Sequence, residues 1–95
     1  MARKAPRVLI DERRIAHIFR QAEGHLPHDT PESRQLLLSV ANEPGDVVGT
    51  DRYGNVWSAR VLPDGRQAWV QVRGNRITNG SINARPRFFI FGYGL

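Results

Sequence analysis

One stretch of the sequence constrains the fold more than any other: Asn55 to Asn79 alternates apolar and polar residues on both sides of a tight turn. The turn is Pro63-Asp64-Gly65, in which proline presets φ and glycine supplies the positive φ that closes a short hairpin. We predict that Leu62 pairs with Gln67, and this register fixes which side chains share a face. One face is then wholly apolar and consists of Trp57, Ala59, Val61, Ala68, Val70 and Val72.

The opposite face of this predicted hairpin holds an indole among cationic and amide side chains. Guanidinium groups bind phosphate, and an aromatic ring can stack on a base. We interpret the face as the floor of a site for an anionic, ring-bearing ligand, most simply RNA. The alternative is an amphipathic hairpin whose outer face is only solvated. The face consists of Val56, Ser58, Arg60, Trp69, Gln71 and Arg73.

Chain length and residue usage limit both the fold and the chemistry. The 95 residues are enough for one domain with a single core. Cysteine is absent, which excludes disulfides, thiolate zinc sites and cysteine nucleophiles. No apolar run is long enough to span a bilayer or to serve as a signal peptide, so we expect a soluble chain without an export signal.

Charge is divided unevenly along the chain, whose formal net charge is +5. Both ends are basic, the middle is acidic, and no acidic residue follows Asp64. Such a division indicates a phosphate-binding surface built from the first segment and the last strands. Lys4 is the only lysine, and arginine, which is used instead, binds phosphate bidentately. GC-rich coding would also favour arginine, so this bias has a second explanation.

The residues ahead of the hairpin predict two helices. Residues 1–10 form a basic leader that we expect to be flexible, and residues 11–95 form a single α+β domain. A first helix is predicted from Asp11 to Gly24, and a second from the Thr30 N-cap to about Ala41. Two N-terminal helices followed by strands predict that the helices pack on one face of a twisted antiparallel sheet of about four to five strands.

The remaining elements are predicted from shorter signals. Val47–Thr50 is a short strand, Gly74-Asn75 is a second turn, and Arg76–Thr78 continues the sheet. Asn79–Asn83 is predicted to be a polar loop, and Arg87–Phe91 is either a last strand or an apolar tail.

Proton transfer in this chain falls to histidine, because cysteine is absent and lysine occurs once. His17 and His25 are separated by a helix end and a glycine turn, a geometry that can bring two imidazoles to one scissile bond. Metal-free RNA cleavage needs a base for the 2′-hydroxyl proton and an acid for the leaving 5′-oxygen, and imidazole suits both. A lone histidine is more often a surface or capping residue, and we interpret His28 as structural.

Cations and neutral donors are predicted to complete the site. The phosphorane gathers negative charge, so arginines must face it in advance. No metal or cofactor is expected, because the carboxylates fall in turns and caps and the histidine spacing is not that of a helical zinc pair. The predicted catalytic residues are His17, His25, Arg60 and Arg73. The predicted substrate-binding residues are Arg20, Ser58, Trp69, Gln71, Thr78 and Asn79.

Several short segments resemble the C-terminal toxin modules of bacterial polymorphic and contact-dependent growth inhibition toxins, within the barnase, EndoU, colicin and RelE-like ribonuclease superfamily. The resemblance covers about residues 15–86. It rests on the segments 17–20, 24–26, 29–34, 49–57, 62–65, 69–73 and 79–83. The chain departs from that family at Arg60, where the family has lysine, and at Gly80-Ser81, where it has two glycines. The first departure keeps a cation but removes a possible proton donor.

The resemblance implies a metal-independent endoribonuclease that cleaves RNA, with tRNA as the expected substrate. Cleavage by 2′-hydroxyl attack would leave a 2′,3′-cyclic phosphate. Such a toxin acts in the bacterial cytoplasm, is a monomer when free, does not bind membranes and is neutralised by an acidic immunity protein. Two alternatives stay open: a non-catalytic RNA-binding module, and an inactivated toxin that serves as a protein-interaction domain.

Overall fold

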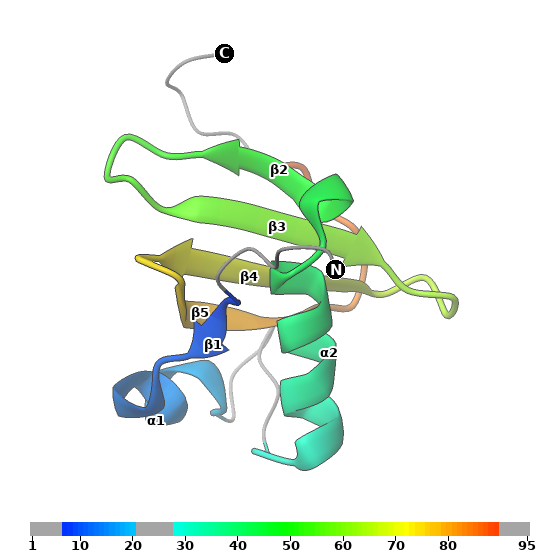
Figure 1. Ribbon diagram of the computed structural model, residues 1–95. Helices are drawn as coiled ribbons and strands as arrows, with labels where there is room; N and C mark the ends of the chain where they lie inside the picture. Colours follow the sequence, from blue (N-terminus) through cyan, green and yellow to red (C-terminus); the bar gives the residue numbers. More distant parts are fainter. Residues whose placement is uncertain (1–6, 21–27, 90–95) are drawn as a thin grey trace, which may run out of the picture.

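The computed structural model describes residues 7–20 and 28–89, and its centre is a five-stranded sheet with the strand order β1-β5-β4-β3-β2 (Figure 1). The strands β2 to β5 pair antiparallel, whereas β1 runs parallel to β5. The α+β class is therefore confirmed, but the prediction of a purely antiparallel sheet is wrong. The strands are β1 (Leu9–Ile10), β2 (Val47–Thr50), β3 (Val56–Val61), β4 (Gln67–Arg73) and β5 (Arg76–Asn83).

The helix α2 (Pro31–Ala41) packs across one face of this sheet (Figure 1). It begins where the sequence predicts, because the Thr30 side chain accepts a hydrogen bond from Ser33 N at 3.1 Å and proline occupies the first turn. Its buried residues Leu37 and Val40 join the core with apolar residues of the sheet. The core consists of Ile10, Ile18, Phe19, Leu37, Val40, Ala68, Val70, Val72 and Ile77.

The first helix is much shorter than the predicted span from Asp11 to Gly24. A 3-10 turn, η1 (Glu12–Arg14), leads into α1 (Ile15–Ile18), and the backbone is extended at Phe19. Ile18 and Phe19 are both buried, so the change from helical to extended backbone at Phe19 places two consecutive side chains in the core. The predicted continuation over 21–27 lies outside the described residues.

The prediction that two N-terminal helices share one sheet face is also wrong. β1 precedes both helices in the chain, and α1 lies beyond the edge of the sheet beside β5, so α2 covers the face (Figure 1). The predicted leader likewise ends earlier than residue 10, because Leu9 and Ile10 pair with Arg76 and Ile77 and Ile10 is buried. Residues 1–6 lie outside the described part of the chain.

The predicted hairpin of β3 and β4 forms, but its register differs by one residue. Val61 pairs with Gln67, so the predicted pairing of Leu62 with Gln67 is wrong. The cause is the loop: Leu62 N donates to Arg66 O at 2.7 Å, and Gly65 has a φ of 90°. Leu62 and Arg66 therefore close a three-residue turn in place of a four-residue one.

A shift of one residue exchanges the two faces of β3. Trp57 now pairs with Gln71, which puts its indole on the same side as Trp69, away from α2. Ser58 and Arg60 pair with Val70 and Ala68 on the side that α2 covers. The predicted division into an apolar face and a cationic face is therefore wrong.

The last strand is longer than predicted. β5 begins after the turn at Gly74-Asn75, which forms as predicted and in which both residues have positive φ. It runs through the segment 79–83 that was expected to be a loop. Gly80 makes this pairing possible, because a Cβ there would lie 2.9 Å from Trp69 O. Residues 87–89 form no strand, and positions 90 and 91 lie outside the described residues.

Candidate functional site

A polar cavity of about 130 Å³ is lined by residues from the start of β3 and β5, the end of β4 and the region of α1. These parts of the chain lie at one end of the sheet (Figure 1). It is smaller than the roughly 300–1,000 Å³ of sites that enclose a drug-sized ligand. It therefore suits one polar group of a larger ligand. Every residue that lines it carries a polar side chain: Arg14, His17, Asn55, Gln71, Arg73, Thr78 and Asn79.

A β-bulge in β5 brings two of these side chains together. Gln71 pairs with Asn79, but the next residue, Val72, pairs with Ile77, so Thr78 is an extra residue in β5. Regular alternation would point Thr78 and Asn79 to opposite faces of the sheet, whereas both line this cavity. Bulges next to functional sites commonly redirect a side chain in this way.

The charge of the residues that line the cavity comes from two arginines. Arg14 and Arg73 are exposed, and neither has an ion pair with a carboxylate in the part of the chain that the structure describes. By contrast, Arg34 and Arg60 each lie within 3 Å of a carboxylate oxygen. Two unpaired guanidinium groups at one cavity favour an anion, above all phosphate.

The neutral residues add donors beside these cations. Asn79 Oδ1 accepts from Gly80 N at 2.9 Å, which leaves the Nδ2 group to donate into the cavity. Thr78 Oγ1 makes only a long contact of 3.4 Å with Gln71 O. His17, on the exposed side of α1, contributes an imidazole that can donate or accept a proton.

Asn55 is fixed in the cavity wall by the carboxylate of Asp51. Asp51 accepts hydrogen bonds from Asn55 N and Nδ2, from Tyr53 N and from Trp57 Nε1, all between 2.9 and 3.0 Å. Burial alone raises the pKa of Asp51, but these hydrogen bonds, led by that of Trp57, outweigh it and lower the pKa to about 2. The carboxylate is thus ionised at neutral pH and holds the loop before β3.

The cavity brings together five of the residues that the sequence predicted: His17, Gln71, Arg73, Thr78 and Asn79. Two other lining residues, Arg14 and Asn55, were not predicted from the sequence. Arg14 stands three residues before His17, a spacing that puts both on one side of a helix and could have identified it. Asn55 carried no such signal, because its place depends on its bonds to Asp51. His25 lies outside the described residues.

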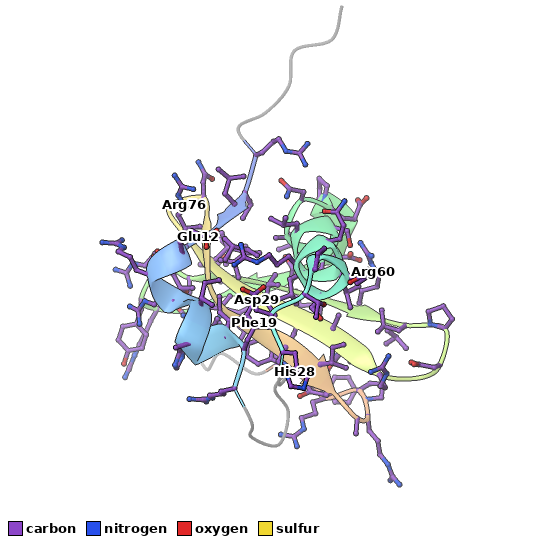
Figure 2. The ribbon with its side chains drawn as sticks, turned by 90° about the horizontal axis from the view of Figure 1, so that it is seen from below. Glu12, Phe19, His28, Asp29, Arg60 and Arg76 are labelled. Atoms are coloured by element: carbon purple, nitrogen blue, oxygen red, sulfur yellow. The ribbon has the colours of Figure 1, made fainter. Side chains whose placement is uncertain are left out.

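Arg60 is not part of this cavity. It lies on the face covered by α2, where Nε donates to Asp46 Oδ2 at 2.8 Å and the two terminal nitrogens donate to the hydroxyl and the carbonyl of Ser39. Figure 2 shows Arg60 on the side of α2 away from Glu12 and Arg76. Asn55, directly before β3, is five residues away, which is roughly 17 Å at the rise of a strand. Arg60 therefore stabilises the contact between β3 and α2.

Three further predicted substrate-binding residues lie elsewhere. Ser58 is 2 % exposed beneath α2. Trp69 stacks on Trp57 with ring centroids 5.7 Å apart, and Phe89 contacts both rings. The indole that was predicted to stack on a base therefore packs against other side chains of the protein. Arg20 is exposed after α1 and does not line the cavity.

Comparisons of the chain with protein-family models, with curated proteins and with solved structures give no match. Within residues 7–20 and 28–89, neither helix has the length and hydropathy that crossing a membrane would require. Fold and cavity together define a small α+β protein with a cationic, polar cavity at one end of a mixed sheet.

Proposed function

We propose that this protein is a metal-independent endoribonuclease whose cavity holds the scissile phosphate of RNA. The observation that carries the proposal is the joint presence of an imidazole and two unpaired guanidinium groups at one small cavity, from His17, Arg14 and Arg73. Among the residues that line the cavity there is no carboxylate to repel a phosphate. A phosphate diester supplies the anion that such a cavity favours.

The proposed reaction is an internal transfer at phosphorus. A base removes the proton of the 2′-hydroxyl, the 2′-oxygen attacks phosphorus, the bond from phosphorus to the 5′-oxygen breaks, and an acid protonates that oxygen. The products are a 2′,3′-cyclic phosphate and a 5′-hydroxyl. Arg14 and Arg73 stabilise the negative charge of the phosphorane, the part first assigned to Arg60 and Arg73.

His17 performs one of the two proton transfers in this proposal, and His25 performs the other. The order of acid and base is left open, since imidazole serves in either form. The donors of Gln71, Thr78 and Asn79 orient the phosphate and the sugar. Positioning and charge stabilisation of this kind account for a large part of catalysis at phosphorus.

The resemblance to toxin modules extends the proposal to the biological setting. In it the protein is a toxin that cleaves tRNA in the bacterial cytoplasm and is blocked by an acidic immunity protein. The net charge of +5 favours an acidic partner. An apolar cavity of about 420 Å³ beside exposed Val48, Val61 and Phe88 supplies a surface that a protein partner can cover.

A second candidate is a module that binds RNA without cutting it. It is favoured by the presence of one imidazole, that of His17, among the cavity residues that the structure describes. The same cations would bind RNA, with an affinity that falls steeply as salt is raised. New 5′-hydroxyl ends on the RNA separate the two candidates, because only cleavage creates them.

The test uses the purified protein with total RNA or tRNA and EDTA. We expect cleavage, and we expect His17→Ala to lower the rate at least about a hundredfold, the usual size of an acid–base contribution. Gln35→Ala, an exposed helix position away from the cavity, is the control and keeps the wild-type rate. RNA that is bound but not cut supports the second candidate, and undiminished cleavage by His17→Ala overturns the assigned role of His17.

A further inference from the structure

Asn55 has a buried hydrogen-bond acceptor that nothing in the described chain satisfies. The residue is 7 % exposed and lines the cavity. Its Nδ2 donates to Asp51 Oδ2 at 2.9 Å, but Oδ1 has no hydrogen-bond partner within residues 7–20 and 28–89. The atom itself has less than 1 Å² of exposed surface, so a partner reaches it from the cavity only when a neighbouring side chain turns aside. Buried polar atoms in native proteins are nearly always paired, so an unpaired one in a residue that lines a cavity points to a missing partner.

The orientation of this amide is fixed by chemistry. The ionised carboxylate of Asp51 can only accept hydrogen bonds, so the amide must turn its Nδ2 group towards it. Exchanging the nitrogen and oxygen of Asn55 would set two acceptors against each other. Asp51 is itself held by Tyr53 N and Trp57 Nε1, so it serves as a rigid support.

We propose that Asn55 is a ligand-binding residue whose Oδ1 accepts a hydrogen bond from the bound RNA once a neighbouring side chain turns aside, and that Asp51 is the residue that positions it. The identity of the ligand as RNA rests on the proposed function. Arg14 and Arg73 offer donors only, so the acceptor of Asn55 complements them. A ligand with a donor close to its phosphate matches this arrangement, and the donor is either a ribose hydroxyl or a base N–H.

The test measures binding in a His17→Ala background with EDTA, so that the RNA stays intact. The probes are a single-stranded oligoribonucleotide and the oligodeoxyribonucleotide of matching sequence, at one fixed salt concentration. Asn55→Ala is expected to weaken RNA binding about tenfold, the size of one hydrogen bond to a buried group. If the donor is a ribose hydroxyl, DNA binding is unchanged, and if it is a base N–H, both weaken alike. Equal affinities before and after the substitution overturn the proposal.

Asp51→Asn tests the positioning role. We expect it to weaken RNA binding as Asn55→Ala does, and we expect the two substitutions together to add little to either one, because they act on one unit. A merely structural role would lower the melting temperature and leave the affinity measured well below melting unchanged. That result would remove Asp51 from the proposal.

Folding of the variants is monitored by thermal melting. If they unfold, a second measurement still tests the proposal, because it uses a protein that keeps both Asn55 and Asp51. The side-chain amide resonance of Asn55 in the His17→Ala protein is expected to shift when the oligoribonucleotide is added, but not when inorganic phosphate alone is added. An unchanged resonance at saturating RNA overturns the inference.

Failure of this inference can be told apart from failure of the proposed function. A wild-type protein that never cuts RNA but binds it in an Asn55-dependent way overturns the ribonuclease proposal and supports the role of Asn55. A wild-type protein that cuts RNA, with the same kcat/KM in Asn55→Ala, overturns only the role of Asn55.

Discussion

Arg60 donates from Nε to Asp46 Oδ2 at 2.8 Å, and this pair ties β3 to the turn that follows α2. The Asp46 side chain is only 17 % exposed, so its carboxylate depends on Arg60 as a partner. The most prominent cation of the predicted RNA-binding face thus has a structural role. Arg73, predicted on the same face of the hairpin, lies at the opposite end of the sheet in the polar cavity.

Arg60→Ala and Arg73→Ala are therefore expected to change different properties, the first stability and the second RNA cleavage. Loss of Arg60 should lower the free energy of unfolding by about 1 kcal/mol, a modest value because its side chain is 35 % exposed and water offsets part of the loss. RNA cleavage at a temperature well below melting should be unchanged. Loss of Arg73 should leave stability nearly unchanged and reduce cleavage. Urea unfolding and RNA cleavage, measured on both variants, check this, and equal loss of cleavage in the two would contradict it.

Asp51 predicts how stability depends on pH. Its pKa is about 2 in the folded protein against an ordinary value of 3.8, so the unfolded chain binds a proton first as pH falls. The stabilisation by Asp51 is therefore complete above about pH 4 and is lost as pH falls through about 2. In urea unfolding between pH 2 and 5, the difference between wild type and Asp51→Asn should shrink towards the acid end. A difference that stays constant over that range would contradict the prediction.

Gly80 of β5 lies opposite Val70 of β4, where there is no space for a side chain. An added Cβ would stand 2.9 Å from Trp69 O and 3.2 Å from Val70 Cγ1, so backbone must move to admit it. We expect Gly80→Ala to destabilise the protein by roughly 1–3 kcal/mol. Gly45→Ala is the matched control, because its nearest contact is the end of the Glu43 side chain at 3.3 Å. Thermal melting compares the two, and equal melting temperatures would show that β5 adjusts freely.

Trp69 should have no direct role in RNA binding. Its indole packs against Trp57 and Phe89, so we expect Trp69→Leu to lower the melting temperature while leaving the RNA affinity of the folded protein unchanged. If Trp69 stacked on a base, this substitution would instead weaken binding by about fivefold to a hundredfold. Fluorescence titration of a labelled oligoribonucleotide measures the affinity. Arg14→Ala is the positive control, since losing one phosphate contact should reduce the salt dependence by about one charge.

Local chemistry determined those parts of the fold that depend on neighbouring residues. Thr30 and Pro31 place the start of α2, and Gly74-Asn75 places the turn between β4 and β5, because caps and turns are decided by the backbone preferences of a few adjacent residues. The α+β class follows from the same signals. Five cavity residues could also be predicted, because their side chains have the chemistry that phosphate requires.

The tertiary structure decided those features that depend on contacts between distant parts of the chain. The pairing of β1 with β5 and the end of α1 at Phe19 depend on contacts between segments far apart in the chain. The register of β3 against β4 depends on a choice between two loops that differ in length by one residue. That single residue moved Arg60 to the α2 face and Trp57 to the other, because side chains alternate along a strand. The bulge at Thr78 and the bonds of Asp51 then completed the cavity with residues that no local pattern connects.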